Sequence, residues 1–154
     1  MDAICHGGDL RKGRVSIPGQ AYLITTVVRD RYPVFRNLMA GRVLVQALRR
    51  HQIEGFAETL AFVVRPDHLH WLMVLGERGN LSSVVQALKS GSSRRIRGLE
   101  SQYRKFAWQR GFHDRALRRD ENLRVVARYV VANPLRAGLV TEIAQYTLWD
   151  AVWL

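Results

Sequence analysis

The chain has 154 residues, of which 47% are hydrophobic, and its 24 basic residues outnumber 13 acidic ones to give a net charge of +11. Length and composition predict one domain over residues 1–154, and no apolar run approaches the length of a membrane span. The start lacks the pattern of a signal peptide, and the single cysteine excludes an internal disulfide and any multi-cysteine metal site, so we expect a cytoplasmic protein.

The first third of the chain predicts an arm, a strand and a helix. Residues 1–20 are basic and contain a Pro-Gly pair, which predicts an N-terminal arm that ends in a turn. The segment from Ala21 to Arg29 is apolar and β-branched, as expected for a first strand. Asn37 is predicted to cap a helix that continues through His51, because apolar residues recur there at helical spacing.

A short link in the middle of the chain predicts an antiparallel hairpin. Leu60–Val64 is a second predicted strand, and Arg65–Asp67 leaves room only for a tight turn into a further strand. Gly76–Gly79 predicts another turn, after which Asn80 is expected to cap a helix. The apolar residues of that helix recur on one face, as expected for an amphipathic helix, at Leu81, Val84, Val85 and Leu88.

The last third predicts one more strand and one more helix. Phe106–His113 has the composition of a strand, with a bend or bulge at Gly111. Asp120 is predicted to cap a helix from Glu121 to about Ala132, and Pro134 is predicted to end it by excluding α geometry at the residue before it.

The order of these elements, β-α-β-β-α-β-α, predicts the fold class. It places helices against one face of an antiparallel sheet, an α+β sandwich of ferredoxin-like type. Residues 141–154 form a C-terminal tail, whose aromatic residues we expect to pack over an open edge or face of the sheet: Tyr146, Trp149 and Trp153.

Two histidines within the predicted strand Pro66–Val74 form the first candidate site. Because side chains alternate along a strand, His68 and His70 point to one face, while Leu69 and Trp71 point to the other. Each neutral imidazole needs partners for both ring nitrogens, and a divalent metal ion would take a lone pair from each ring. Two separately hydrogen-bonded histidines at a strand edge are the alternative, and the His-x-His pattern alone does not decide between them.

The basic residues indicate the kind of partner. Arginine accounts for 21 of them and lysine for three, and twelve basic but only four acidic residues lie between Lys89 and Arg128. The planar guanidinium binds phosphate with two hydrogen bonds and stacks on bases, so this bias favours nucleic acid over a membrane surface. A solvated basic face without a partner is the competing interpretation.

The last predicted helix carries the second candidate site. Tyr129 and Asn133 are four residues apart and therefore lie on one face, about a quarter-turn from the apolar stripe. On its own, Tyr129 would be interpreted as a boundary residue that buries its ring and leaves its hydroxyl in water.

Taken together, the two candidate sites resemble a known family. His-hydrophobe-His on a strand, followed by a helix with Tyr-x-x-x-Asn and then Pro, resembles the HUH single-strand DNA transposases, and more closely the REP-associated tyrosine transposases of bacteria. The resemblance covers nearly the whole chain. It is carried by Arg11–Arg14, Pro18–Tyr22, Pro66–Trp71, Trp108–Asp114 and Tyr129–Val140.

The resemblance implies an activity and its residues. Members of the family cut and rejoin single-stranded DNA at REP-type hairpins through a 5′-phosphotyrosine intermediate, with Mg²⁺ or Mn²⁺ as cofactor. Carried over to this chain, the resemblance implies Tyr129 as the nucleophile and His68, His70 and Asn133 as metal ligands. More distant relatives have Gln at the position of Asn133, so the resemblance supports this third ligand less strongly than the other three residues. A phenol is a weak nucleophile at neutral pH, so such a reaction needs a metal that polarises the phosphate.

The expected partner is single-stranded or hairpin DNA, for a protein associated with the nucleoid. A monomer is expected, and a dimer stays open. Lys89 is a candidate for DNA or active-site contact against a solvated lysine, and His113 for substrate contact against a turn-stabilising pair with Asp114. The full set of candidate DNA-binding residues is Arg11, Lys12, Arg14, Lys89, Arg94, Arg95, Arg110 and His113.

Two other classes of function stay open at this stage. A binding module would hold the same hairpins through its arginines without cutting them, and would lose nothing when Tyr129 becomes Phe. A metallohydrolase would use a metal-bound water on His68 and His70 and form no covalent intermediate, but the sequence lacks the extra Asp or Glu ligands that such sites normally add.

Overall fold

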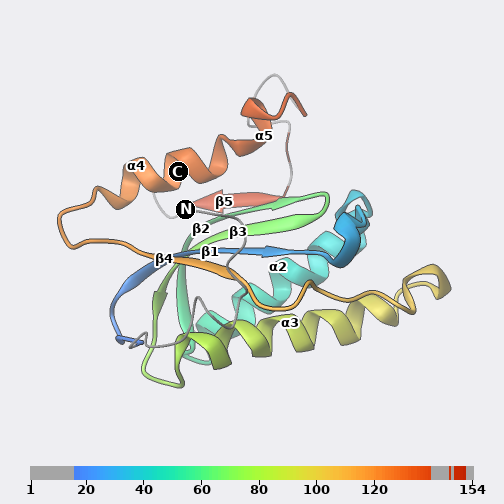
Figure 1. The fold of residues 1–154 in the computed structure, drawn as a ribbon, viewed down its shortest axis with the longest axis horizontal. Coiled ribbons are helices and arrows are strands. Elements are labelled where there is room, and N and C mark those ends of the chain that lie inside the picture. The colour runs from blue at the N-terminus through green and yellow to red at the C-terminus, as the bar shows by residue number, and fades with distance from the viewer. Residues whose placement is uncertain (1–15, 140–145, 147, 152–154) are drawn as a thin grey trace.

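A computed structural model describes residues 16–139, 146 and 148–151 of the chain. At its centre is a five-stranded, fully antiparallel sheet with the strand order β4-β1-β3-β2-β5 (Figure 1). The strands are β1 (Ala21–Val27), β2 (Ala57–Arg65), β3 (His68–Leu75), β4 (His113–Ala116) and β5 (Trp149–Ala151). The helices are α2 (Leu38–Ile53), α3 (Leu81–Arg97), α4 (Leu123–Val131) and the short α5 (Asn133–Arg136), with 3-10 turns at Arg29–Arg31, Val34–Arg36 and Ser101–Tyr103.

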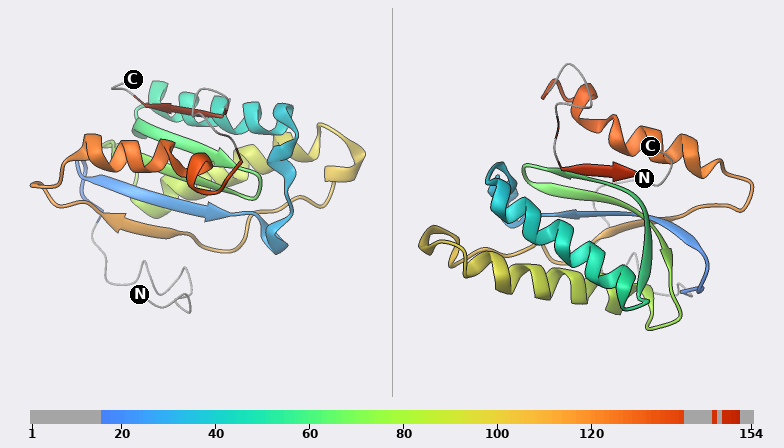
Figure 2. Two further views of the ribbon diagram at one scale, coloured as in Figure 1. Left: turned by 90° about the horizontal axis from the view of Figure 1, so that it is seen from above. Right: turned by 180° about the vertical axis from the view of Figure 1, so that it is seen from behind.

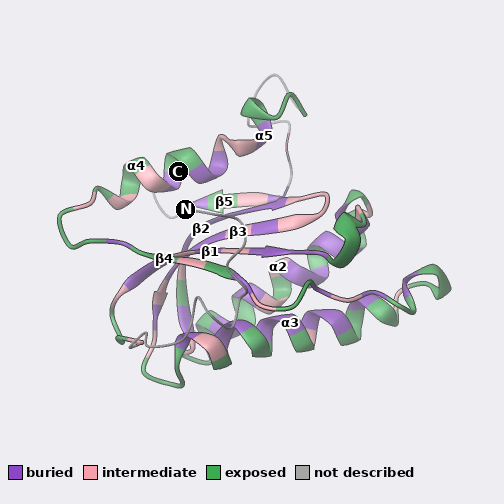
Figure 3. Ribbon diagram, in the orientation of Figure 1, coloured by how far each residue is buried: buried purple, intermediate pink, exposed green. Residues whose placement is uncertain are grey.

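The helices cover both faces of the sheet. Helices α2 and α3 pack on one face, and α4 packs on the other (Figure 2). The α+β class is confirmed, but the expectation that all helices share one face is wrong. The reason is that the central strands β2 and β3 are apolar on both faces, as the run of buried residues along them shows (Figure 3). The face under α2 and α3 buries Ile24, Trp71 and Met73, and the face under α4 buries Ala61, Val63 and Leu72.

The hairpin and two helix caps are confirmed. In the β2–β3 hairpin Arg65 pairs with His68, so the link between the strands is the two residues Pro66 and Asp67. The Asn37 side chain accepts hydrogen bonds from two backbone N–H groups of the first turn of α2, and Asn80 accepts one from the first turn of α3. These contacts satisfy donors that a helix N-terminus otherwise leaves without partners.

The strand predicted at Phe106–His113 is wrong, because β4 begins only at His113. Before it, Trp108 makes a single bridge to Val28, and the backbone turns at Gly111 with a φ of +74°. Phe106 and Trp108 are buried against Phe35 in an aromatic cluster of the α2–α3 face. Packing of these rings, rather than strand pairing, therefore sets the path of the segment.

The predicted start of the last helix is corrected, whereas its predicted end at about Ala132 is confirmed. Asn122, not Asp120, caps α4, and its side chain accepts hydrogen bonds from the N–H groups of Arg124 and Val125. After Val131 the helix is interrupted, but Ala132 keeps α geometry and a second short helix, α5, begins at Asn133. Pro134 lies in the first turn of α5, where a missing N–H costs nothing, so it starts a helix as well as ending one.

The tail closes one edge of the sheet, as predicted for Tyr146 and Trp149. Strand β5 pairs with β2, and the Tyr146 hydroxyl donates a hydrogen bond to the backbone oxygen of Val64. Trp153 lies outside the described residues. No helix in the described part of the chain combines the length and apolar character needed to cross a membrane.

Candidate active site

The histidine pair opens strand β3 and faces the layer formed by α4. As predicted, Leu69 and Trp71 point to the opposite face and are completely buried. The Nε2 atoms of His68 and His70 lie 3.1 Å apart, and the two rings are nearly perpendicular, with an interplanar angle of 83°. Both rings therefore direct one nitrogen to the same point above the sheet.

The outer nitrogen of each ring is held by a polar side chain. His68 Nδ1 lies 2.6 Å from a carboxylate oxygen of Asp67, and His70 Nδ1 lies 3.0 Å from the hydroxyl of Thr25, its neighbour on β1. An ionised carboxylate only accepts, so His68 donates from Nδ1 and its Nε2 carries the lone pair. A hydroxyl donates or accepts, so Thr25 serves either tautomer of His70. Such outer contacts fix the orientation of metal-binding histidines.

The surroundings keep both imidazoles neutral. Burial lowers the pKa of His70 to about 4, and the nearby charges of His68, Arg65 and Arg136 act in the same direction. Burial also lowers the pKa of His68, although the hydrogen bond and charge of Asp67 partly oppose it. At neutral pH the lone pairs are therefore available to a cation.

The spacing of the pair fits one divalent ion. Two ligands at right angles around an ion about 2.1 Å away lie about 3 Å apart, close to the separation of the two Nε2 atoms. In residues 16–139, 146 and 148–151 no group of three or more His, Cys, Asp or Glu side chains could hold a metal.

Asn133 is connected to the strands of the histidine pair by a hydrogen bond with an arginine. Its side-chain oxygen accepts a hydrogen bond from Arg65, which pairs with His68 in the β2–β3 hairpin. The charge of Arg65 acts on both imidazoles, so the guanidinium lies close to the pair. The structure thus links the candidate third ligand to the strands that carry the other two, with its oxygen engaged by Arg65.

Tyr129 is more exposed than expected for a boundary residue. The residue is 61% exposed, which disagrees with the alternative interpretation of a boundary tyrosine with a buried ring. Arg136 covers one face of the ring, with Cζ 3.8 Å from the ring centre, and donates to the backbone oxygen of Tyr129 at 2.7 Å. The charge of the same guanidinium also contributes to the lowered pKa of His70.

The candidate DNA-binding residues divide into three groups. Arg11, Lys12 and Arg14 lie outside the described residues. Lys89 is buried, and its ammonium donates to the backbone oxygens of Gln109 and Gly111 at 2.7 Å each, so it braces the bent segment before β4. The exposed members are Arg94, Arg95, Arg110 and His113.

Several of these residues gather around an open cavity of about 660 Å³ between α3 and the segment 107–111. Its charged lining residues are Arg29, Lys89, Arg94, Arg97 and Arg110, and none of the described residues that line it is acidic. Arg95 lies outside this cavity and donates to Gln46. His113 lies elsewhere, on β4, in the same row across the sheet as Thr25 and His70.

Sequence reasoning missed four residues that shape the site: Thr25, Arg65, Asp67 and Arg136. Asp67 directly precedes the first histidine, and this adjacency in the sequence could have predicted the hydrogen bond between the two side chains. Thr25 could be assigned only once the register of β1 against β3 was known. Arg65 meets Asn133 across two layers, and Arg136 meets Tyr129 across the break between α4 and α5, and no local pattern indicates either contact.

The site combines a histidine pair on a central strand with an exposed tyrosine on the helix that covers the same face of the sheet. Comparison with known protein families identifies the class of protein to which this arrangement belongs. The family model described as "Transposase IS200 like" matches residues 16–133. The chain belongs to this family, which implies tyrosine transposase activity and typically uses a divalent metal.

Individual proteins agree with the family. A Haemophilus influenzae protein assigned as a REP-associated tyrosine transposase is 30% identical over an alignment of 138 positions, which covers 83% of this chain and 77% of the relative. Among solved structures, a REP-associated tyrosine transposase bound to a REP hairpin has a TM-score of 0.71 at 24% identity, over 88% of this chain and 79% of that one. A transposase from Deinococcus radiodurans has a TM-score of 0.55 at 23% identity, over 80% and 96%. The two structures support the fold.

Proposed function

We propose that this protein cuts and rejoins single-stranded DNA at REP-type hairpins, with Tyr129 as the nucleophile and a divalent metal as cofactor. The observation that carries the proposal is the histidine pair, whose two neutral rings bring their Nε2 atoms together on the face of the sheet that α4, the helix with Tyr129, also covers. Family membership and the relationship to a REP-associated tyrosine transposase support the class of reaction.

The proposed metal ligands are His68, His70 and Asn133. Mg²⁺ or Mn²⁺ held there would withdraw charge from the phosphate oxygens of the DNA. Asp67 and Thr25 keep the two rings in the required orientation. Arg65 holds the amide oxygen of Asn133 near the pair, and its charge, like that of Arg136, favours an approaching phosphate.

The proposed chemical step is a transfer between two esters. The hydroxyl oxygen of Tyr129 bonds to phosphorus, the bond from phosphorus to the 3′ oxygen breaks, and the proton lost by the tyrosine is balanced by the one gained at the new 3′-OH. The product is a 5′-phosphotyrosine, and reversal of the step rejoins a strand without ATP. Arg136 limits the movement of Tyr129, because its guanidinium covers one face of the ring and donates to the backbone oxygen of the tyrosine. These contacts leave the hydroxyl of the exposed tyrosine accessible to DNA.

The proposed DNA surface includes the basic cavity between α3 and residues 107–111. Arg94 and Arg110 supply exposed charge there, and Lys89 contributes by holding the backbone in place. His113 extends this surface towards the histidine pair along one row of the sheet. Arg11, Lys12, Arg14 and Arg95 are proposed as further contacts to the phosphates of the hairpin, on the basis of their charge.

The test is incubation with single-stranded hairpin DNA and Mn²⁺, followed by a denaturing gel. The wild-type protein should form a covalent protein–DNA adduct, and Tyr129→Phe should form none while it binds the hairpin normally. Tyr22→Phe is the control, because Tyr22 is buried on the opposite face of the sheet and should leave the adduct unchanged. Adduct formation by Tyr129→Phe would contradict the proposed nucleophile, and a wild-type protein that binds without cutting would support a binding module.

A further inference from the structure

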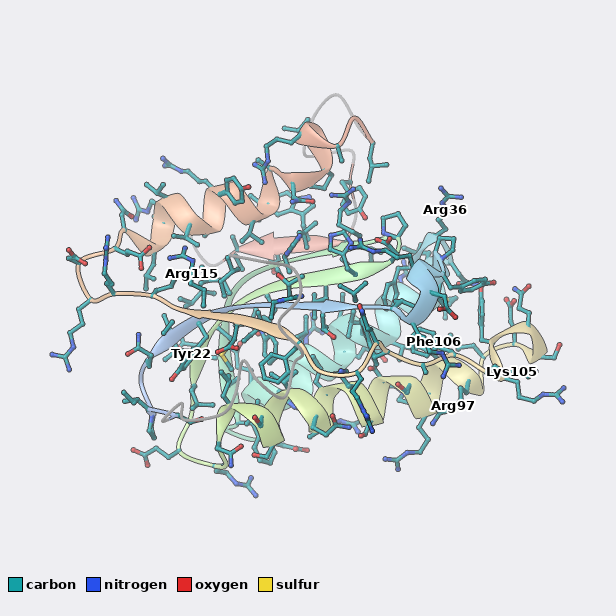
Figure 4. All side chains as sticks on the ribbon, viewed as in Figure 1. Tyr22, Arg36, Arg97, Lys105, Phe106 and Arg115 are labelled. Carbon is teal, nitrogen blue, oxygen red and sulfur yellow. The ribbon has the colours of Figure 1, made fainter. Side chains whose placement is uncertain are left out.

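We propose that the loop Arg29–Tyr32 and the segment facing it form a pocket for one unpaired base of the DNA strand, beside the histidine pair. The nature of the ligand rests on the proposed function. The pocket itself is a separate feature at the end of the sheet where β1 ends and β3 begins, near Phe106 and Lys105 (Figure 4).

The pocket has an aromatic lining of suitable size. Its volume is about 500 Å³, within the range of sites for small ligands. Tyr32 is 48% exposed, whereas Tyr103 and Phe106 beneath it are buried. The rings of Tyr32 and Tyr103 meet edge to face, with centres 6.4 Å apart. The accessible ring of Tyr32 therefore lies against the buried ring of Tyr103. Bases of single-stranded DNA stack on such platforms.

Cations surround this aromatic lining. Arg29, Arg31 and Lys105 line the pocket with a single acidic residue, Asp30. Arg29 also lines the basic cavity along α3, so the two cavities share a wall. An aromatic platform continuous with a strip of arginines fits a base together with the phosphates that follow it. An uncharged apolar ligand would leave the cations without a role.

The loop holds an unusual backbone to present Tyr32. Asp30 and Arg31 have φ values of 58° and 56°, two successive non-glycine residues in the left-handed region. Each costs on the order of 1–3 kcal/mol unless its surroundings hold it. Backbone hydrogen bonds from Arg31 to Val28 and from Tyr32 to Arg29 do so here. The strained turn directs the exposed ring away from the core of the α2–α3 face.

The loop is connected directly to the candidate metal site. The N–H of Val28 donates to the backbone oxygen of Asp67 at 2.8 Å, and the Arg31 guanidinium lies 3.6 Å from the Asp67 carboxylate. That same carboxylate accepts from His68. A base in the pocket would thus belong to a nucleotide close to the scissile phosphate.

The proposal is tested by binding alone, in a Tyr129→Phe background that cannot form the adduct. The probe is a ten-residue oligothymidylate with one central 2-aminopurine, whose fluorescence falls when it stacks on an aromatic ring. The Tyr129→Phe protein should quench the probe. Adding Tyr32→Ala should abolish the quenching and weaken binding about 10-fold, in line with the loss of one base–aromatic stack. Tyr32→Phe should retain both, because it keeps the ring.

Two further variants make the result decisive. Tyr32→Leu keeps an apolar side chain over Tyr103, so it protects the fold and should still lose the quenching. Ile53→Ala removes an apolar side chain that is 79% exposed outside the pocket, and should change nothing. Absence of quenching by the Tyr129→Phe protein, or full quenching by Tyr32→Leu, would overturn the base pocket. Either result would leave the adduct assay, and with it the proposed function, unaffected.

Discussion

The β2–β3 hairpin and the α4–α5 segment supply the two halves of the proposed site, and they are built in opposite ways. In the hairpin, every ring nitrogen of His68 and His70 has a partner within 3.1 Å. In the helical segment, Tyr129 is exposed and the helix is interrupted at Ala132. The difference teaches that the proposed metal half is preorganised by hydrogen bonds, whereas the proposed nucleophile half is exposed to a substrate that would complete its surroundings.

The largest effect is expected from the histidines. His68→Ala and His70→Ala each remove one of the two paired nitrogens, so cleavage of hairpin DNA with Mn²⁺ should be abolished while hairpin binding, measured by gel shift, is retained. Ile53→Ala changes an exposed side chain outside the proposed site, so it is the control and should still support cleavage. Normal cleavage by the His68→Ala/His70→Ala double variant would contradict the proposal that these two histidines bind the metal.

The stability of the metal-free protein should depend on pH through His70. Its pKa is about 4 in the folded protein and 6.5 in the unfolded chain, so the unfolded state binds the proton first as the pH falls. The contribution, about 3 kcal/mol, is fully present above pH 6.5 and is lost between pH 6.5 and 4. Urea unfolding in EDTA should show this loss, and His70→Asn should flatten it. An unchanged slope would mean that the imidazole is not held neutral by burial.

Thr25 tests whether the hairpin orients its ligands. Thr25→Val keeps the shape of the side chain and removes the hydroxyl that meets His70, so Mn²⁺ affinity measured by calorimetry should fall about 10- to 100-fold. Thr26→Val is the matched control on the other face. The Thr26 hydroxyl is buried with no hydrogen-bond partner in the described structure, so this change should leave affinity intact and raise stability by about 1 kcal/mol. Equal affinities for the two variants would show that the outer contact is dispensable.

The smallest effect concerns the start of α4. Asn122→Ala removes the helix cap and should lower the free energy of unfolding by about 1 kcal/mol, while Mn²⁺ binding stays unchanged because the hairpin is not touched. Asp120→Ala, two residues earlier and exposed, should change stability by less than about 0.5 kcal/mol. If urea unfolding showed the larger loss of stability for Asp120→Ala, Asp120 rather than Asn122 would be the helix cap, as the sequence had predicted.

The hairpin half was predictable from the sequence, and the helical half only in part. Alternation along a strand determined that His68 and His70 share a face, and a two-residue link allowed only an antiparallel hairpin. Helical periodicity places Tyr129 off the apolar stripe of α4, but it does not say which face of the sheet the helix covers.

The remaining differences arise from side chains of separate elements that come into contact in the folded protein. The exposure of Tyr129, its contact with Arg136 and the contact between Arg65 and Asn133 depend on tertiary packing. The segment before β4 was predicted as a strand because its composition suits one, whereas its rings are drawn into the aromatic cluster around Phe35.

The central claim is that Tyr129 forms the covalent bond to DNA, and peptide mapping of the adduct tests it most directly. Trypsin cleaves after Arg128 and after Arg136 but not within the peptide between them, which contains Tyr129 as its single tyrosine. After nuclease digestion of the adduct, mass spectrometry should find the added nucleotide on this peptide, attached through a phosphate to the tyrosine. A nucleotide on a peptide containing any other tyrosine would contradict the assignment.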